Sequence, residues 1–224
     1  MANASFTRDE VILTLDALYC AGDASLTKNS QAIAQLCRLL QELPIHPEAK
    51  RPPNFRNTVG VSDQIRSFRE QMKGGGERPR WGVGKLFFVV AKEYEDRHDE
   101  LHAVAEAIRR NRGFFRLYTF GQTEECAGFP EGALLSHLHR RVEVRDSDRL
   151  EKGNRCAVCK LGVEGAYQGC DNFLEAHLLV PITELDARKS YSEKDFIMVC
   201  PNCHAALHRF RPWRTRENVE DILK

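Results

Sequence analysis

Two C-x-x-C pairs in the second half of the chain constrain its fold more than any other feature. Cys156 and Cys159 form the first pair, and Cys200 and Cys203 form the second. In an intracellular chain such spacing is typical of a tetrahedral zinc site, because two turns each present two thiolates to one ion. The pairs therefore predict a small module that a structural zinc ion stabilises.

The start of the chain favours an intracellular location. The segment MANASFTRDE lacks the charged and apolar regions of a secretory signal, and no apolar run is long enough to cross a bilayer. We therefore expect a cytoplasmic protein that makes no contact with a membrane. The formal net charge is +1, so the overall charge does not point to a class of partner.

The first half of the chain is predicted to be an all-α domain over residues 1–111. Apolar residues recur at helical spacing in TRDEVILTLDALYC, SQAIAQLCRLLQEL, VSDQIRSFREQM, KLFFVVAKEY and LHAVAEAIRR. The first of these segments opens with a capping box from Thr7 to Glu10. Cys20 and Cys37 fall within two of the patterns, and we expect both to be buried as small hydrophobic residues.

The second half is predicted to be a separate domain over residues 131–224, after a connection at 112–130. Its first segment, LLSHLHRRVEVRD, alternates in places as a strand does. The glycine-rich stretch GGGERPRWGVGK in the first half lacks the spacing of a phosphate-binding loop, so we expect it to be a hinge or an exposed loop.

Three histidines accompany the cysteines. His204 and His208 are four residues apart, which puts both imidazoles on one face of a helix, and His177 lies in EAHLLVP. Four cysteines and three histidines are too many ligands for one tetrahedral ion. The simplest division gives the cysteines to a structural zinc and the histidines to a second metal. The alternative is that the histidines complete or merely surround the zinc site.

From EGALLSHLHRR to RPWRTRENV the chain resembles the HNH endonucleases with a ββα-metal core, specifically the McrA-like group with a zinc ribbon. C-x-x-C, EAHLLVPITEL, KDFIMVC and CPNCHAALH follow one another as the corresponding motifs do in that family. The resemblance implies an α+β protein in which an all-α domain precedes a small ββα-metal domain with a zinc ribbon of four cysteines. It also implies metal-dependent hydrolysis of double-stranded DNA, modified or unmodified, as in the restriction of foreign DNA, and a homodimer.

The resemblance assigns a role to each residue that matches the family pattern. His177, His204 and His208 correspond to ligands of a divalent catalytic metal, which is Mg, Mn, Co, Ni or Zn. Asp195 corresponds to the residue that orients the catalytic base through a hydrogen bond, and the four cysteines correspond to the ligands of structural zinc.

Leu178 departs from the family pattern. The family has a histidine at this position, three residues before Pro181, and that histidine is the general base. Leucine cannot accept a proton, and loss of a general base costs roughly a hundred- to ten-thousandfold in rate. The chain is therefore either an inactive or silenced nuclease, or a non-catalytic DNA-binding protein stabilised by zinc. No residue excludes RNA as the substrate.

Several basic residues are candidates for contacts with DNA. Arg56, Arg66 and Arg69 lie at the start of a predicted helix or along it, and Arg209 and Arg211 follow the last histidine. Phe55 and Trp81 are candidates for stacking on a flipped base, with packing in the core as the alternative.

Overall fold

The computed structural model describes residues 3–22, 26–73, 84–117, 130–147, 150, 153–162 and 173–223. The chain divides into two compact units, one of Met1–Ala127 with Glu131–Ala133, and one of Gly128–Pro130 with Leu134–Lys224. Three parts of the sequence analysis lie outside the described residues. They are most of the expected connection at 112–130, the glycine-rich stretch at 74–83 with Trp81, and two further cysteines at 126 and 170. No helix in the described ranges is both long enough and apolar enough to cross a membrane.

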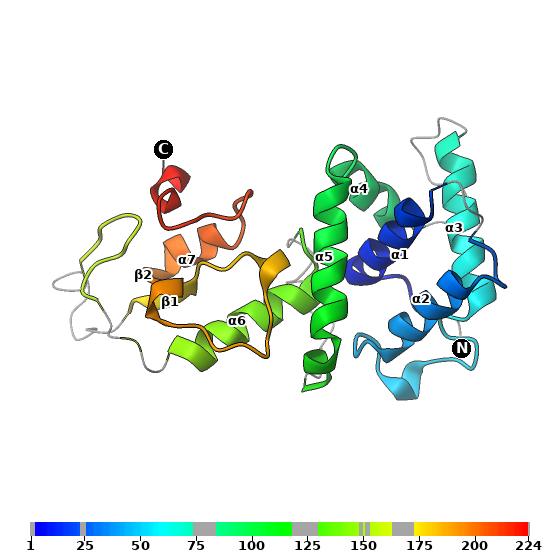
Figure 1. Cartoon of the computed structure of the whole chain (residues 1–224), viewed down its shortest axis with the longest axis horizontal. Coiled ribbons are helices and arrows are strands. Elements are labelled where there is room, and N and C mark those ends of the chain that lie inside the picture. Colours follow the sequence, from blue (N-terminus) through cyan, green and yellow to red (C-terminus); the bar gives the residue numbers. More distant parts are fainter. Residues whose placement is uncertain are drawn as a thin grey trace. The chain divides into compact units, whose positions relative to one another are not determined.

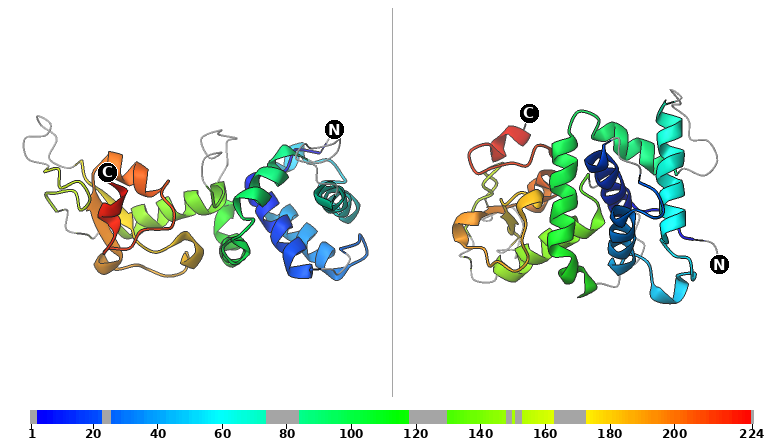
Figure 2. Two further views of the ribbon diagram at one scale, coloured as in Figure 1. Left: turned by 90° about the horizontal axis from the view of Figure 1, so that it is seen from above. Right: turned by 45° about the vertical axis from the view of Figure 1, so that its right-hand side comes forward.

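The first unit is helical, as predicted for the N-terminal region. Its α-helices are α1 (Arg8–Ala21), α2 (Gln31–Glu42), α3 (Thr58–Lys73), α4 (Lys85–Glu93) and α5 (His98–Asn111), with short 3-10 helices η1 (Glu48–Lys50) and η2 (Arg112–Leu117). Helix α1 packs against α2, α4 and α5, and α2 packs against α3. Figure 2 shows this helical unit from two further directions.

Helix α1 is the centre of the first unit. The predicted capping box is present, because the Thr7 side chain accepts a hydrogen bond from the Glu10 backbone and Glu10 accepts one from the Thr7 backbone. Burial extends beyond the one apolar stripe seen in the sequence, since Leu13 and Thr14 are also fully buried. Neighbouring helices on several sides of α1 account for this burial. Cys37 in α2 is buried as predicted, whereas Cys20 at the end of α1 is exposed.

Arg56 belongs to the interior of this unit rather than to a DNA-binding surface. Its guanidinium donates to both carboxylate oxygens of Glu10, at 2.6 and 2.9 Å, and to the backbone oxygens of Ala4 and Ser5. Only 3% of Arg56 is exposed. These donors already have partners inside the fold, so the environment of Arg56 favours a structural role over the predicted contact with DNA. Phe55 is also buried, which favours core packing over base stacking.

The second unit combines helices with one hairpin. Its elements are α6 (Ala133–Ser147), β1 (Glu175–Leu178), η4 (Ile182–Glu184), η5 (Glu193–Asp195), β2 (Phe196–Val199), α7 (Pro201–Leu207) and η6 (Val219–Ile222). Strands β1 and β2 pair antiparallel, with His177 opposite Ile197 and Leu178 opposite Phe196. Figure 1 shows α6, the hairpin and α7 within this unit.

Helix α6 corrects the expectation of a strand in LLSHLHRRVEVRD. Leu134, Leu138 and Val142 are spaced by four residues and are all buried, which is the pattern of a helix with one face in the core. The partial alternation of apolar and polar residues in this segment did not reflect strand geometry. The change matters for function, because a helix brings a different set of polar side chains toward the hairpin.

Candidate metal centres

The four cysteines come together at one point of the second unit. Cys156, Cys159, Cys200 and Cys203 have their sulfur atoms within 4.8 Å of one another. The Sγ atoms of Cys159 and Cys200 lie 3.8 Å apart. Sulfurs bound tetrahedrally to zinc at about 2.3 Å are separated by about 3.8 Å, so the cluster is compatible with structural zinc.

Two local structures hold these sulfurs in place. After Cys156 the chain makes a tight turn, in which Lys160 donates its N–H to the Cys156 carbonyl at 3.0 Å and adopts a positive φ of 61°. Cys200 is the N-cap of α7, and Cys203 lies in the first turn of that helix. Burial raises the pKa of the Cys156 thiol, but backbone hydrogen bonds from the metal-site turns lower it to about 7. The same backbone groups favour the thiolate that zinc requires.

A second cluster forms beside the hairpin from His177, His204, His208 and Glu143. His177 comes from β1, the other two histidines come from the C-terminal helix α7 and its end, and Glu143 comes from α6. Glu143 Oε1 lies 3.2 Å from His177 Nδ1, and Glu143 Oε2 lies 3.4 Å from His204 Nε2 and from His208 Nε2. The Nε2 atoms of His204 and His208 lie 3.0 Å apart.

These separations fit one tetrahedral ion. Nitrogen and oxygen ligands bound at about 2.0–2.1 Å are about 3.3 Å from one another in a tetrahedral site. His177 Nδ1 supplies a further test, because it is buried and its polar neighbour among the described residues, Glu143 Oε1 at 3.2 Å, does not meet it with good hydrogen-bond geometry. A buried nitrogen that lacks a well-aligned partner is costly, and an ion between the two groups would satisfy both. The cluster can therefore hold a metal ion.

The electrostatics of this cluster also suit a cation. Burial acts to raise the pKa of Glu143, but the surrounding histidines, His139 first among them, hold it well below its ordinary value. Burial lowers the pKa of His177 to about 4 and also lowers the pKa of His208. The neutral imidazole is the form that binds metal, so both rings are in the required state near neutral pH.

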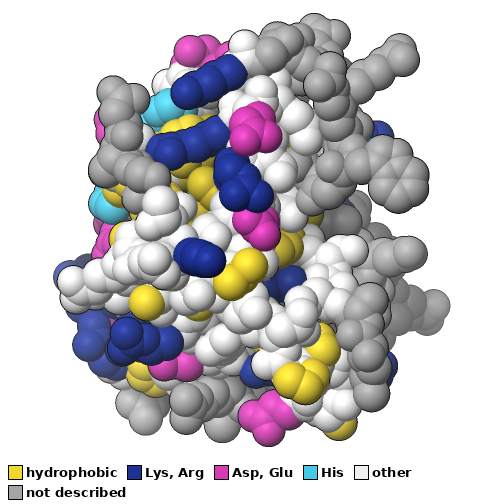
Figure 3. All heavy atoms as spheres, turned by 90° about the vertical axis from the view of Figure 1, so that its right-hand side faces the viewer, with side chains coloured by type: hydrophobic (Ala, Val, Ile, Leu, Met, Phe, Trp, Pro, Cys, Tyr) yellow, Lys and Arg dark blue, Asp and Glu magenta, His cyan; other side chains and the backbone are white. Residues whose placement is uncertain are grey.

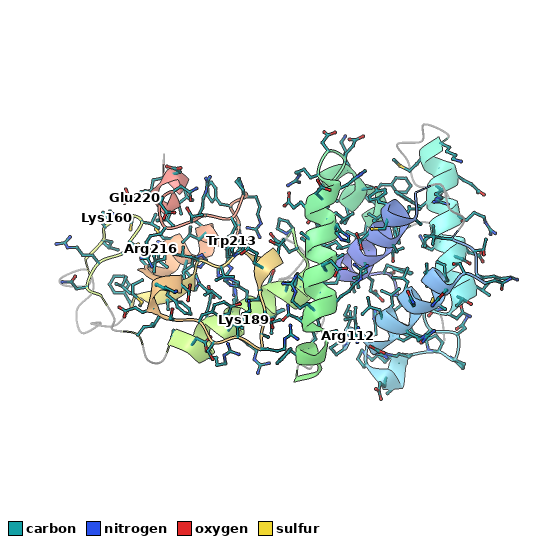
Figure 4. The ribbon with its side chains drawn as sticks, viewed as in Figure 1. Arg112, Lys160, Lys189, Trp213, Arg216 and Glu220 are labelled. Atoms are coloured by element: carbon teal, nitrogen blue, oxygen red, sulfur yellow. The ribbon has the colours of Figure 1, made fainter. Side chains whose placement is uncertain are left out.

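Residues around the cluster fix the orientation of its members. Glu175 Oε2 lies 2.6 Å from His204 Nδ1, which leaves His204 Nε2 to face the other ligands. Trp213 is labelled in Figure 4. Its ring stacks on the His177 ring at a centroid distance of 5.6 Å, and its Nε1 donates to the Leu179 carbonyl. Carboxylate and backbone partners of this kind typically set the tautomer and tilt of ligating histidines.

The cluster borders a cavity. This cavity of about 440 Å³ is lined by Glu143, His204 and His208 of the cluster, and also by Glu175 and Arg140. Leu178 does not line this cavity. Its side chain is fully buried, while its backbone N–H donates to Glu143 Oε1 at 3.0 Å.

Asp195 precedes the second strand of the hairpin and contacts the first strand mainly through its backbone. Its carbonyl accepts a hydrogen bond from Leu179 N–H at 2.8 Å, immediately after β1. Its side chain accepts from the backbone and hydroxyl of Ser192, capping η5. The Asp195 carbonyl thus holds the chain directly after β1, and its carboxylate is engaged in the local turn. The expected role of Asp195 in orienting a catalytic base stays a prediction.

The remaining arginine candidates differ in exposure. Arg66 is 66% exposed and pairs with Asp63 one turn earlier on α3. Arg69 is half-buried and donates to the Gly22 carbonyl at 2.7 Å. Arg209 is exposed at the end of α7, and Arg211 is half-buried beside the Trp213 ring. On the face drawn in Figure 3, Lys and Arg side chains lie among Asp and Glu side chains.

Glu143 is the site residue that the sequence analysis missed. The segment that contains it was expected to be a strand, and a single glutamate in a basic stretch carries no metal-binding signature. A helical interpretation of the segment would have placed Glu143 one turn after His139 on the same face. Glu175 shares a strand with His177, and the structure shows its carboxylate beside His204.

Comparisons with models of known protein families, with curated protein sequences and with solved structures gave no match. The interpretation of the two clusters therefore depends on their own geometry and chemistry.

Proposed function

We propose that the second unit is a metal-dependent DNA endonuclease domain of the HNH type, in which this chain lacks the general base. The observation that carries the proposal is the convergence of His177, His204, His208 and Glu143 on one point beside a hairpin and its following helix. This arrangement resembles a ββα-metal core, and the four-cysteine cluster of the same unit resembles a zinc ribbon. The helical unit would then direct the protein to its DNA target. The proposed substrate is double-stranded DNA, modified or unmodified, and the proposed assembly is a homodimer.

We assign a separate role in the reaction to each group of residues around the cluster. The three histidines and Glu143 would hold a divalent ion, which in such sites polarises the scissile phosphate and stabilises the leaving oxygen. Glu175 orients His204, and Trp213 supports His177. Arg140 lines the same cavity, where a cationic side chain would favour binding of a phosphate.

A second candidate function is that of a non-catalytic DNA-binding protein. Two features favour it. Leu178 offers no proton acceptor, and Glu143 supplies a fourth ligand, which would fill a tetrahedral ion as structural zinc sites are filled. In this alternative both metals stabilise the fold.

The Glu143→Gln substitution is expected to release the metal of the histidine cluster. Glutamine keeps the size of the side chain but removes the negative charge and one strong ligand. The loss of affinity should exceed the roughly 10- to 100-fold that loss of an outer partner costs. Metal content after dialysis against a weak chelator measures the effect. Glu175→Gln is the matched control, and it should keep the metal with a weaker affinity. Equal metal content in Glu143→Gln and wild type would exclude Glu143 as a ligand.

Binding to DNA tests the partner in this proposal. Fluorescence anisotropy with a labelled duplex should show affinity that falls as salt rises, and Arg209→Ala should reduce the slope of log K against log salt by about 0.9. Arg188→Ala is the control with the same change in net charge, because the Arg188 guanidinium already pairs with Asp186 at 2.8 Å and is not expected to neutralise a phosphate. Absence of DNA binding by the wild-type chain at low salt would overturn both candidate functions.

A further inference from the structure

A third group of metal-binding side chains lies in the helical unit, far along the sequence from the two clusters already described. Asp16 and Cys20 are four residues apart on α1, which puts them on one face of that helix, and His102 reaches them from α5. Their candidate ligand atoms all lie within 4.8 Å of one another. Nothing in the proposed nuclease function uses these residues.

The two sulfur distances are compatible with a metal site, and they are also those of weak hydrogen bonds from a thiol. Cys20 Sγ lies 3.5 Å from Asp16 Oδ1 and 3.6 Å from His102 Nδ1. A sulfur bound at about 2.3 Å and a nitrogen or oxygen bound at about 2.0 Å to one tetrahedral ion are about 3.5 Å apart. The third side of the triangle, from Asp16 Oδ1 to His102 Nδ1, is 2.8 Å, so a small outward movement of the exposed His102 ring is needed.

Asp16 has the environment of a ligand that is held in place. Its side chain is only 3% exposed, and Arg109 binds its second oxygen, Oδ2, at 2.6 Å. Oδ1 is thereby left to face Cys20 and His102. An outer partner that holds one carboxylate oxygen while the other faces the ligand group is common around metal ions in proteins.

The group borders a cavity, and Cys20 and His102 are exposed. A cavity of about 650 Å³ is lined by all three side chains, and Arg38 and Arg112 also line it. Arg112 follows α5 and is labelled in Figure 4. Solvent can therefore supply the fourth ligand that three protein ligands leave open.

The simpler interpretation of the group is an ion pair between α1 and α5. A charged His102 and Arg109 on either side of Asp16 would link the helices without any metal. That interpretation gives no role to Cys20, whose thiol is a weak hydrogen-bonding group. The two interpretations therefore differ in whether Cys20 matters.

We propose that Asp16, Cys20 and His102 bind a zinc ion that links α1 to α5, with water as the fourth ligand. One thiolate, one imidazole and one carboxylate are ligands that zinc accepts, whereas magnesium and calcium prefer oxygen alone. The site is independent of the nuclease proposal, since it shares no residue with either cluster of the second unit.

Zinc content of the full chain tests this proposal. Equilibrium dialysis against buffered, low-micromolar free zinc should give about one zinc ion less per chain for Cys20→Ala than for wild type. Cys37→Ala removes a buried thiol on α2 and should keep the wild-type zinc content. His102→Gln should lose the same ion as Cys20→Ala, while circular dichroism confirms that each variant keeps its helices.

The test compares the zinc content of each variant with that of the wild type. Zinc bound by the histidine cluster is present in both and does not change the difference. Equal zinc content in wild type and Cys20→Ala would overturn the third site and leave the ion pair as the explanation. Loss of zinc in His102→Gln but not in Cys20→Ala would also contradict it, because the thiolate is the ligand that selects zinc.

Discussion

Leu178→His is expected to cleave double-stranded DNA roughly a hundred- to ten-thousandfold faster than the wild-type chain in the presence of a divalent metal. The substitution places a proton acceptor at the position that the HNH resemblance assigns to the general base. Cleavage requires the new imidazole to reach the cavity, which the buried Leu178 side chain does not line. Leu178 lies directly after His177 on β1, and its backbone already contacts Glu143 of the metal cluster. Plasmid nicking with magnesium, manganese, cobalt, nickel or zinc, on modified and unmodified DNA, measures the effect.

The controls for this variant separate chemistry from folding. Leu178 is fully buried, so a histidine there places a polar ring in the core at a cost of about 1–3 kcal/mol. Leu178→Gln introduces a polar side chain without a base and should bind DNA but cut no faster than wild type. A folded, metal-loaded Leu178→His that binds DNA and does not cut it would favour the non-catalytic function.

Cys200→Ser is expected to unfold the second unit while the helical unit keeps its structure. Structural zinc contributes about 10–16 kcal/mol of apparent binding free energy in zinc-finger peptides, and the described core of this unit contains Cys156, Cys200 and Cys203 themselves. Cys200 also begins α7, which carries His204 and ends at His208. Loss of the thiolate should therefore remove the metals of both clusters.

Limited proteolysis followed by mass spectrometry measures this loss for each unit separately. The fragments expected from Cys200→Ser come from the second unit, and a chelator should give the same pattern with the wild-type chain. Cys37→Ala, which removes a buried thiol from the helical unit, is the control and should leave the second unit resistant. Resistance of Cys200→Ser equal to that of wild type would mean that no zinc ion stabilises this unit.

The sequence predicted those parts of the structure that depend on local spacing. The C-x-x-C pairs converge, His204 and His208 face one point because they are one helical turn apart, and Thr7 and Glu10 form the capping box. Each of these features involves residues within a few positions of one another, or a pattern with few structural solutions.

The features that were missed depend on contacts between distant residues. The sequence suggested that Arg56 is a basic residue on the surface. In the structure it is buried and pairs with Glu10, which is 46 residues away. Glu143 reaches the metal cluster only because α6 is a helix that lies against the hairpin. Cys20 follows the apolar pattern of α1 but lies at an exposed end of that helix. The environments of these three residues depend on burial and on contacts with distant residues. The spacing of apolar residues along one sequence does not reveal either.

Anomalous diffraction from crystals of the full chain, recorded at the absorption edges of zinc and of the transition metal supplied, tests the central claim most directly. If the second unit holds two metal centres, the anomalous difference map should contain two separate peaks. One should lie among Cys156, Cys159, Cys200 and Cys203, and the other among Glu143, His177, His204 and His208. A peak at the cysteines alone, from crystals grown with excess metal, would contradict the account, because the histidine cluster would then be a buried network without an ion.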